Sequence, residues 1–311
     1  KGLSMASIIK KPSFDFLRAR HVAIGISAAL VLLTLVTVLV RGGNVLSIDF
    51  AGGTAITFLV EGEQPSVGVA RQAVKDLGHS SARVGYKYAA QSDVRLLEVV
   101  LAKRSTNEAD LDLDALEKGL NEKLAPAVLK RGQTNSVGSL IGERFRWKAL
   151  WAAVWATLAI IVYISFRFEF AYGVASVVAL IHDVVIAGGI YLLCGRQLSL
   201  PVVAALLTIM GYSLNDTIVV FDRIREDLGL LHSKSYREII NLSINQTLSR
   251  TLLTSLTTLL VVVVLFLFGG GSINDFALVM MVGVVVGTYS SIFVASTMIA
   301  AWHKPTRQER G

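Results

Sequence analysis

Six long apolar runs, separated by more polar segments, dominate the chain. They cover residues 21–40, 148–166, 171–194, 200–221, 250–268 and 276–302. A helix needs about 20 mostly apolar residues to cross the hydrocarbon core of a bilayer, so each run is long enough to span a membrane. The first run is too long for the apolar part of a signal peptide and lacks a small-residue cleavage site before Arg41. We therefore predict a mainly α-helical membrane protein in which all six spans are retained.

Residues 42–146 differ from the rest because they are polar and alternate between strand and helix patterns. The predicted order is strand, helix, strand, strand, helix, strand, over residues 54–60, 64–78, 82–88, 94–101, 111–130 and 133–137. This β-α-β-β-α-β order is typical of ferredoxin-like domains, which are built on a split βαβ unit. We expect a small α+β domain of this kind between the first and second spans.

The pattern divides the chain into four parts. An N-terminal arm and the first span take residues 1–41, and the α+β domain takes 42–146. Residues 147–302 form a bundle of the remaining five spans, with a polar loop of two short surface helices at 222–249. A basic tail, 303–311, follows.

The composition supports a membrane protein and narrows its chemistry. Hydrophobic residues make up 53% of the chain and charged residues 17%, against about 25% charged in soluble proteins. The single cysteine, Cys194, excludes an internal disulfide, and no further His or Cys falls at metal-ligand spacing. Because no Walker loop, GxSxG or HExxH motif is present, we expect no enzyme activity, no metal and no resident cofactor.

Lysine and arginine residues cluster at the predicted membrane boundaries. They gather in the N-terminal arm, after the fourth run and in the tail, while the opposite short loops carry only Arg196. Membrane topology therefore explains the formal net charge of +7 better than binding of nucleic acid does. Positive residues favour the cytoplasmic side, so we predict that both termini are cytoplasmic and that the α+β domain lies outside.

Asp216 is the strongest candidate for chemistry, because it lies inside the fourth apolar run. Six residues, or about 9 Å of helix, separate it from the charged segment that begins at Asp222. A carboxylate at this depth costs about 2.5–3.5 kcal/mol on insertion scales, so it needs a use or a partner. Arg250, just inside the fifth run, is the predicted partner. A movement that brings Arg250 close and removes it again would change the proton affinity of Asp216, as in a proton carrier.

Both residues could also have a structural role that involves no proton transport. Asp216 could be a structural acid that holds the fourth and fifth helices together by hydrogen bonds. Arg250 could extend its side chain to the cytoplasmic surface. Further residues expected to orient the carboxyl group or to line a hydrated path are Ser213, Asn215 and Thr217.

His182 and Asp183 form a second ionisable pair near the middle of the third run. Adjacent residues of a helix point about 100° apart, so we expect one of them to face Asp216 and the other a neighbouring helix. Two such groups at this depth suggest a polar relay. A buried hydrogen-bonded pair without a transport role is the alternative.

Three glycines are assigned to helix packing. Gly283 and Gly287, in the sixth run, match the small-xxx-small pattern that lets membrane helices approach closely. Gly211, in the fourth run, is expected to contribute to packing as well.

Several segments resemble the SecF family, the smaller half of the SecD–SecF protein-export factor in the RND superfamily. The resemblance rests on Phe14-Asp-Phe16, Ser47-Ile-Asp-Phe-Ala-Gly-Gly-Thr54, Ser136-Val-Gly-Ser-Leu-Ile-Gly142, Ile181-His-Asp-Val184, residues 211–226 and Arg250. Ser47 stands where the family usually has Gly, and Ser139 where it usually has Pro. Both departures lie outside the predicted membrane spans.

The resemblance implies a six-helix half of an RND fold and a subunit that couples proton flow to late steps of preprotein translocation. Asp216 and Arg250 would lie on the proton path, and the proton gradient would be the energy source. An RND fold has two such halves, so the family implies a SecD half, either separate or fused upstream. SecYEG, YajC, YidC and translocating preproteins are the other expected partners, in the bacterial inner membrane.

Two other functions remain open from the sequence. The chain could be half of an RND-type efflux transporter for small molecules or lipids, although its polar domain of modest size is a poor match for an apolar substrate pocket. It could also be a translocon scaffold that conducts no ions, in which case Asp216→Asn would have no effect.

Overall fold

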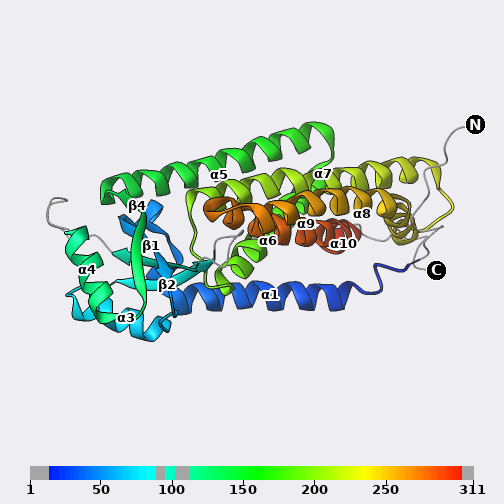
Figure 1. Cartoon of the computed structure of the whole chain (residues 1–311). Coiled ribbons are helices and arrows are strands. Elements are labelled where there is room, and N and C mark those ends of the chain that lie inside the picture. Colours follow the sequence, from blue (N-terminus) through cyan, green and yellow to red (C-terminus); the bar gives the residue numbers. More distant parts are fainter. Residues whose placement is uncertain (1–13, 81, 89–94, 102–111, 303–311) are drawn as a thin grey trace, which may run out of the picture.

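A computed structural model describes residues 14–80, 82–88, 95–101 and 112–302. Long helices form a bundle, and a small α+β domain sits at one end of it (Figure 1). The predictions for the first residues of the N-terminal arm, for the connection between the predicted strands 82–88 and 94–101 and for the tail at 303–311 lie outside the described residues.

Six helices in the described ranges are long and apolar enough to cross a membrane, which confirms the predicted mainly α-helical membrane fold. They are α1 (Arg20–Arg41), α5 (Ser139–Arg167), α6 (Phe170–Leu193), α7 (Leu200–Leu230), α8 (Tyr236–Phe268) and α9 (Gly271–Ser290), the last continuing through the π-helical turn η2 (Ser291–Ala295) into α10 (Ser296–Trp302). Helix α6 and the α9–α10 helix are the most buried, while α1, α5 and α8 expose most of their surface. Their exposed apolar side chains suit contact with lipid or with another membrane subunit.

The structure corrects the prediction for residues 222–249, which do not form a polar loop with two short surface helices. Helices α7 and α8 instead extend beyond the apolar runs, and only residues 231–235 join them. Arg223 forms ion pairs with Glu226 at 2.7 Å and with Asp227 at 3.1 Å. Charged pairs three and four residues apart support a helix in water, so α7 does not end where its apolar run ends.

Capping also lengthens the helices relative to the sequence pattern. A capping box starts α8, in which Ser235 Oγ accepts the Glu238 N–H and the Glu238 carboxylate accepts the Ser235 N–H. The connection between α8 and α9 is short, because α8 ends at Phe268 and α9 already begins at Gly271.

The α+β domain has the predicted ferredoxin-like order. Its elements are β1 (Gly53–Glu61), α3 (Val67–Asp76), β2 (Arg83–Tyr88), β3 (Arg95–Leu101), α4 (Leu113–Lys123) and β4 (Val128–Val137). The strands form an antiparallel sheet in the order β2-β3-β1-β4. Helices α3 and α4 cover one face of this sheet, where Phe58, Leu97 and Leu120 are completely buried.

The boundary between α4 and β4 differs from the prediction. The helix ends at Lys123 rather than at residue 130, and the strand begins at Val128 rather than at 133. Pro126 cannot continue a helix. The Asn121 side chain bonds both backbone groups of Leu129, which returns the chain directly to the sheet.

Two short connections join the α+β domain to the membrane helices. The turn η1 (Gly42–Val45) and the one-turn helix α2 (Ile48–Ala51) lead from α1 to β1. On the other side, α5 begins at Ser139, directly after β4, so residues 139–147, which precede the second apolar run, also belong to α5. The domain is therefore held close to the end of the bundle.

Candidate functional site

Asp216 lies in the middle of α7 and is only 3% exposed. Ser255 Oγ of α8 donates a hydrogen bond to its Oδ2 at 3.3 Å, and Thr254 Oγ1 makes a longer contact of 3.5 Å to Oδ1. Ser255 also shares a 2.6 Å hydrogen bond with Thr288 of α9. The carboxylate is therefore surrounded by hydroxyl groups where α7, α8 and α9 meet.

Arg250, the predicted partner of Asp216, does not bond to it. Its side chain is exposed on α8 and forms no ion pair in the part of the chain that the structure describes. The hydroxyl groups of Thr254 and Ser255, one turn further along α8, occupy the position that the sequence pattern assigns to the guanidinium.

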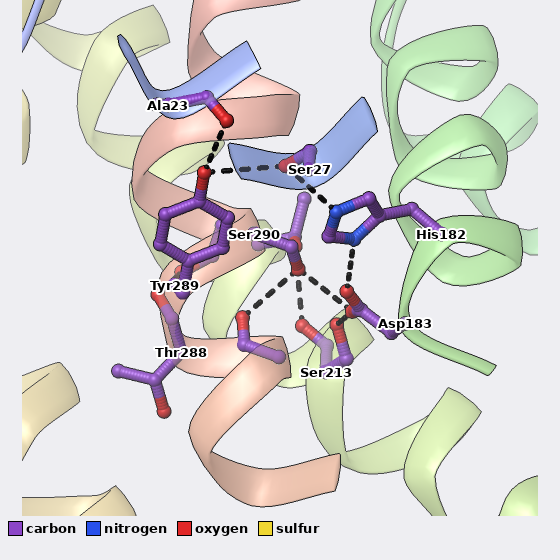
Figure 2. A network of polar contacts seen from close by, with 11 residues as sticks. Ala23, Ser27, His182, Asp183, Ser213, Thr288, Tyr289 and Ser290 are labelled. Carbon is purple, nitrogen blue, oxygen red and sulfur yellow. Dashed lines mark hydrogen bonds and ion pairs between the residues drawn. The ribbon is translucent and has the colours of Figure 1, made fainter. Parts of the chain in front are cut away.

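Asp183 is the centre of a second polar cluster and is completely buried (Figure 2). Its Oδ2 accepts hydrogen bonds from Ser213 of α7 at 2.5 Å and from Ser290 of α9 at 2.7 Å. Its Oδ1 shares a 2.9 Å hydrogen bond with Nδ1 of His182. Three helices therefore meet at this carboxylate.

His182 extends the second cluster to α1. Its Nε2 shares a 2.9 Å hydrogen bond with Ser27 Oγ, and Figure 2 shows the imidazole between Ser27 and Asp183. Tyr289 donates a hydrogen bond to the Ala23 carbonyl oxygen at 2.7 Å and lies 3.2 Å from Ser27 Oγ. A continuous chain of polar contacts thus runs from α1 through α6 to α7 and α9.

The prediction for the His182–Asp183 pair is partly wrong. The two side chains bond each other, and neither has a hydrogen bond to Asp216 among the described residues. Asp183 does face α7, but it contacts Ser213, which lies three residues, or about 4.5 Å of helix, from Asp216. The two carboxylates therefore belong to separate clusters on neighbouring levels of α7.

The three accessory residues are placed differently from the prediction. Ser213 orients Asp183 rather than Asp216. The Thr217 hydroxyl donates to the backbone carbonyl of Ser213. Asn215 lies on the exposed face of α7. Orientation of Asp216 comes instead from Thr254 and Ser255, whose signal in the sequence is a run of hydroxyl residues from Thr251 to Thr258.

Two of the three predicted packing glycines lie at close helix contacts. A Cβ atom at Gly283 would come within 2.1 Å of Ile209 Cδ1, and one at Gly287 within 3.0 Å of Ser213 Cβ. Gly211 was assigned wrongly, because a Cβ there would meet nothing within 4 Å. Gly211 is exposed on α7, so no helix within the described part of this chain requires a small residue at that position.

The described residues hold no group of three or more His, Cys, Asp or Glu side chains that could bind a metal ion. The fold and the two carboxylate clusters define a multi-pass membrane protein with a ferredoxin-like domain at one end of its bundle. Residues 118–305 match the family model described as "Protein export membrane protein SecD/SecF, C-terminal". The chain belongs to this SecD/SecF family.

Relatives along nearly the whole chain are named as translocase subunits. The protein translocase subunit SecF of Desulfurispirillum indicum is 42% identical over 291 residues, which are 92% of this chain and 91% of that protein. The subunit SecDF of Thermus thermophilus is 42% identical over 295 residues, which are 94% of this chain but 39% of that longer protein. The chain is therefore a membrane subunit of the Sec protein-export machinery.

Solved structures agree with the fold. The crystal structure of SecDF from Thermus thermophilus matches 94% of this chain with a TM-score of 0.81 at 40% identity. A second structure, of SecDF in the super-membrane-facing form, matches the same share with a TM-score of 0.66. In both cases this chain corresponds to 39% of the solved chain.

Proposed function

We propose that this subunit couples proton flow across the membrane to late steps of preprotein translocation, with Asp216 as the proton carrier. The observation that carries the proposal is a carboxylate that is 3% exposed within a spanning helix and whose direct partners, among the residues that the structure describes, are hydroxyl groups. Hydroxyl groups can donate to a charged carboxylate and accept from a neutral carboxyl group. The site therefore suits an acid that changes its charge during a cycle.

Arg250 acts as the moving charge in this proposal. It lies one turn before Thr254 and Ser255 on α8, and its long side chain is exposed rather than fixed by an ion pair among the described residues. An approaching cation favours the charged carboxylate, and its withdrawal removes that preference. Alternating approach and withdrawal would release a proton from Asp216 and then allow another to bind.

The cluster around Asp183 is the proposed second part of the path. It links α1 to the helix that carries Asp216, through His182 and Ser213. Ionisable groups inside a membrane protein commonly form such relays. Asn215 stays a predicted member of the path, although its exposed position adds no support.

The available energy is sufficient for a change of domain position. One elementary charge that crosses a potential of 100 mV releases about 2.3 kcal/mol, which shifts a two-state equilibrium about fifty-fold. The α+β domain is the proposed moving part, because it connects directly to α1 and α5. The gradient itself, without a bound cofactor or an enzymatic step, would supply the work.

A SecD half, fused or separate, is the proposed partner within the membrane. The weakly buried helices α1, α5 and α8 offer apolar surface for it, and the relative named SecDF is much longer than this chain. SecYEG, YajC, YidC and translocating preproteins are further proposed partners, and the Thermus thermophilus SecDF is described as translocon-associated. The proposed location is the bacterial inner membrane, with both termini in the cytoplasm and the α+β domain outside.

Preprotein transport into inverted membrane vesicles, with and without a protonophore, tests the proposal. Asp216→Asn keeps the shape of the side chain but cannot carry a proton, so we expect the gradient-dependent part of export to be lost while gradient-independent export remains. Arg250→Met should have the same effect, because it removes the moving charge. The matched control is Asp222→Asn, on the same helix but half-exposed and paired with Arg167.

The amount of subunit in the membrane must stay equal across the variants. If Asp216→Asn and Arg250→Met export as the unchanged protein does, the charges are structural and the scaffold function takes the place of the proton-coupled one. The efflux alternative predicts instead that deletion of the subunit changes drug accumulation and leaves export unchanged.

A further inference from the structure

The chain segment between α1 and β1 is bonded to the start of α7. The Leu198 N–H donates to the Val45 carbonyl oxygen at 2.8 Å, and the Ser47 N–H donates to the Leu198 carbonyl oxygen at 2.9 Å. Leu46 and Leu198 thereby form a parallel β-bridge. We refer to residues 45–49 and 198–200 together as the joint.

Asp49 completes the joint with its side chain. Its Oδ2 accepts a hydrogen bond from the backbone N–H of Leu200, the first residue of α7, at 3.0 Å. The N-cap residue of α7, Ser199, makes no capping bond, and its hydroxyl is buried without a partner in the described structure. Asp49 therefore does for α7 what an N-cap residue ordinarily does, from a segment about 150 residues away in sequence.

The N-terminus of a helix is a favourable place for a carboxylate, for two reasons. The first N–H groups have no partner within the helix, and the helix dipole is positive at this end. Asp49 satisfies both conditions for α7, so the bond is stronger than a contact between neutral groups.

The other side of the joint is packed against α5 and the sheet without free space. A Cβ atom at Gly52 would lie 2.8 Å from Ser139 Cα, and one at Gly142 would lie 3.0 Å from Gly52 N. Gly52 also has a φ of +74°, which only glycine adopts readily. Strand β1 begins at the next residue, Gly53. No flexible linker therefore separates Asp49 from the sheet of the α+β domain.

Helix α7 connects this joint to the proton site. It runs without interruption from Leu200 through Asp216, a distance of about 24 Å at 1.5 Å per residue. Sharp kinks arise at prolines, at Gly/Ser pairs or at bulges; the only proline of α7, Pro201, lies in its first turn, and the helix is continuous from Leu200 to Leu230. A shift of α7 at Asp216 therefore also displaces its outer end.

We propose that Asp49 is a positioning residue that fixes the outer end of α7 to the α+β domain, so that movement of α7 during proton transfer moves the domain. This inference rests on the proposed proton-coupled function and adds the path by which the membrane site reaches the domain. Asp49 touches no proton-carrying group, and it acts through α7. The joint moves as one rigid piece and does not open during the cycle.

The first test compares Asp49→Ala with Asp49→Asn in the vesicle assay. Asp49→Ala should lower the gradient-dependent part of export roughly fivefold, the factor that corresponds to loss of a typical N-cap, with gradient-independent export unchanged. Asp49→Asn keeps an acceptor oxygen and should restore most of the loss. The matched control is Asp112→Ala, since Asp112 caps α4 within the same domain through the N–H groups of Asp114 and Ala115 and has no contact with α7.

The second test closes the joint with a disulfide. Leu46→Cys and Leu198→Cys are placed in a Cys194→Ser background, because paired positions of a β-bridge have the separation that a disulfide needs. A rigid joint predicts that the oxidised protein exports normally and that the disulfide restores gradient-dependent export to Asp49→Ala. Loss of gradient-dependent export on oxidation alone would show that the joint must open and would overturn the proposal.

The outcomes separate this inference from the function on which it rests. If Asp216→Asn loses gradient-dependent export and Asp49→Ala keeps it, the proton site stands and only the role of the joint is refuted. If Asp216→Asn keeps gradient-dependent export, the proposed function fails and the inference falls with it. If Asp112→Ala loses as much as Asp49→Ala, general destabilisation of the domain explains the loss, and the proposal is refuted.

Discussion

At the scale of single residues, hydroxyl groups are the main partners of the two acids that lie inside apolar runs. Asp216 contacts Thr254 and Ser255, and Asp183 accepts from two serines besides its bond to His182. The Thr254 hydroxyl also reaches the backbone carbonyl of Arg250 within its own helix. Because the backbone carbonyl oxygen is a second acceptor, this hydroxyl can break its hydrogen bond to the carboxylate and still have a partner. Such groups suit a site whose charge changes, because neither state leaves them unpaired.

Gly283 gives a residue-scale prediction about packing. Gly283→Val places new methyl groups against the buried Ile209, so we expect a loss of stability of about 1–3 kcal/mol from overpacking. Thermal unfolding of the detergent-solubilised protein measures it. The control Gly211→Val should unfold nearly as the unchanged protein does, because that position has open space around it.

The close contact also predicts a rescue. Ile209→Ala in the Gly283→Val background makes room for the added methyl groups and should recover part of the lost stability. If stability is not recovered, the α9 backbone itself requires glycine at position 283, and the contact between α7 and α9 is not the reason for it.

At the scale of elements, the polar first turns of α8 hold the segment that precedes α1. The Asn241 side chain bonds Phe16 N at 2.8 Å and Phe14 O at 3.0 Å, and Asn245 bonds both backbone groups of Phe14. Phe16 packs edge-on against Phe293 at a centroid distance of 5.7 Å. The extension of α8 beyond the membrane-spanning run therefore has a definite role, because it fixes the start of α1 against the bundle.

Removal of these bonds should free the segment before α1. In the double variant Asn241→Ala and Asn245→Ala, we expect trypsin to cleave after Arg18 and Arg20 roughly tenfold faster or more, because several hydrogen bonds no longer oppose local opening. Gel electrophoresis of the solubilised protein over time measures the rate. The control is Asn215→Ala, which removes an exposed asparagine of α7. Equal cleavage rates in the unchanged protein, the double variant and the control would show that Asn241 and Asn245 do not hold the segment before α1.

At the scale of the whole molecule, the α+β domain and the α6–α7 connection lie at the same end of the bundle. Arg41 donates hydrogen bonds to the carbonyl oxygens of Leu192 and Gly195, and Arg196 is paired with Asp275. The connection of α7 to α8 lies at the opposite end, as the path of the helices requires (Figure 1). The two ends of the bundle therefore lie on opposite sides of the membrane that the helices span.

The single cysteine allows a direct test of the proposed orientation. Cys194 is exposed, next to Gly195, at the same end as the α+β domain. We expect a membrane-impermeant maleimide to label it in intact cells with a permeabilised outer membrane. In a Cys194→Ser background, Lys234→Cys lies at the opposite end and should react only after the inner membrane is broken. The reverse labelling pattern would place the α+β domain in the cytoplasm.

Local signals predicted the elements well where one rule acted alone. Apolar length predicted the six membrane helices, and alternation with turn residues predicted the first three strands, whereas the last strand begins five residues earlier than expected. The prediction from composition failed at 222–249. The polar residues there were interpreted as a loop, although charge pairs within the helix, such as Arg223 with Asp227, extend α7. The use of small residues as markers of helix packing failed at Gly211, because a small residue lies at a contact only when another helix faces it.

The sequence by itself determined the membrane fold, the ferredoxin-like order and the presence of an acid within each of two apolar runs, because these depend on apolar length, on periodicity and on the identity of a residue within a run. The tertiary structure decided which side chains meet. Hydroxyl groups rather than Arg250 contact Asp216, His182 bridges Asp183 to Ser27, and Asp49 caps α7. These contacts join segments far apart in the chain, and they depend on how helices rotate and pack against one another, which no local pattern specifies.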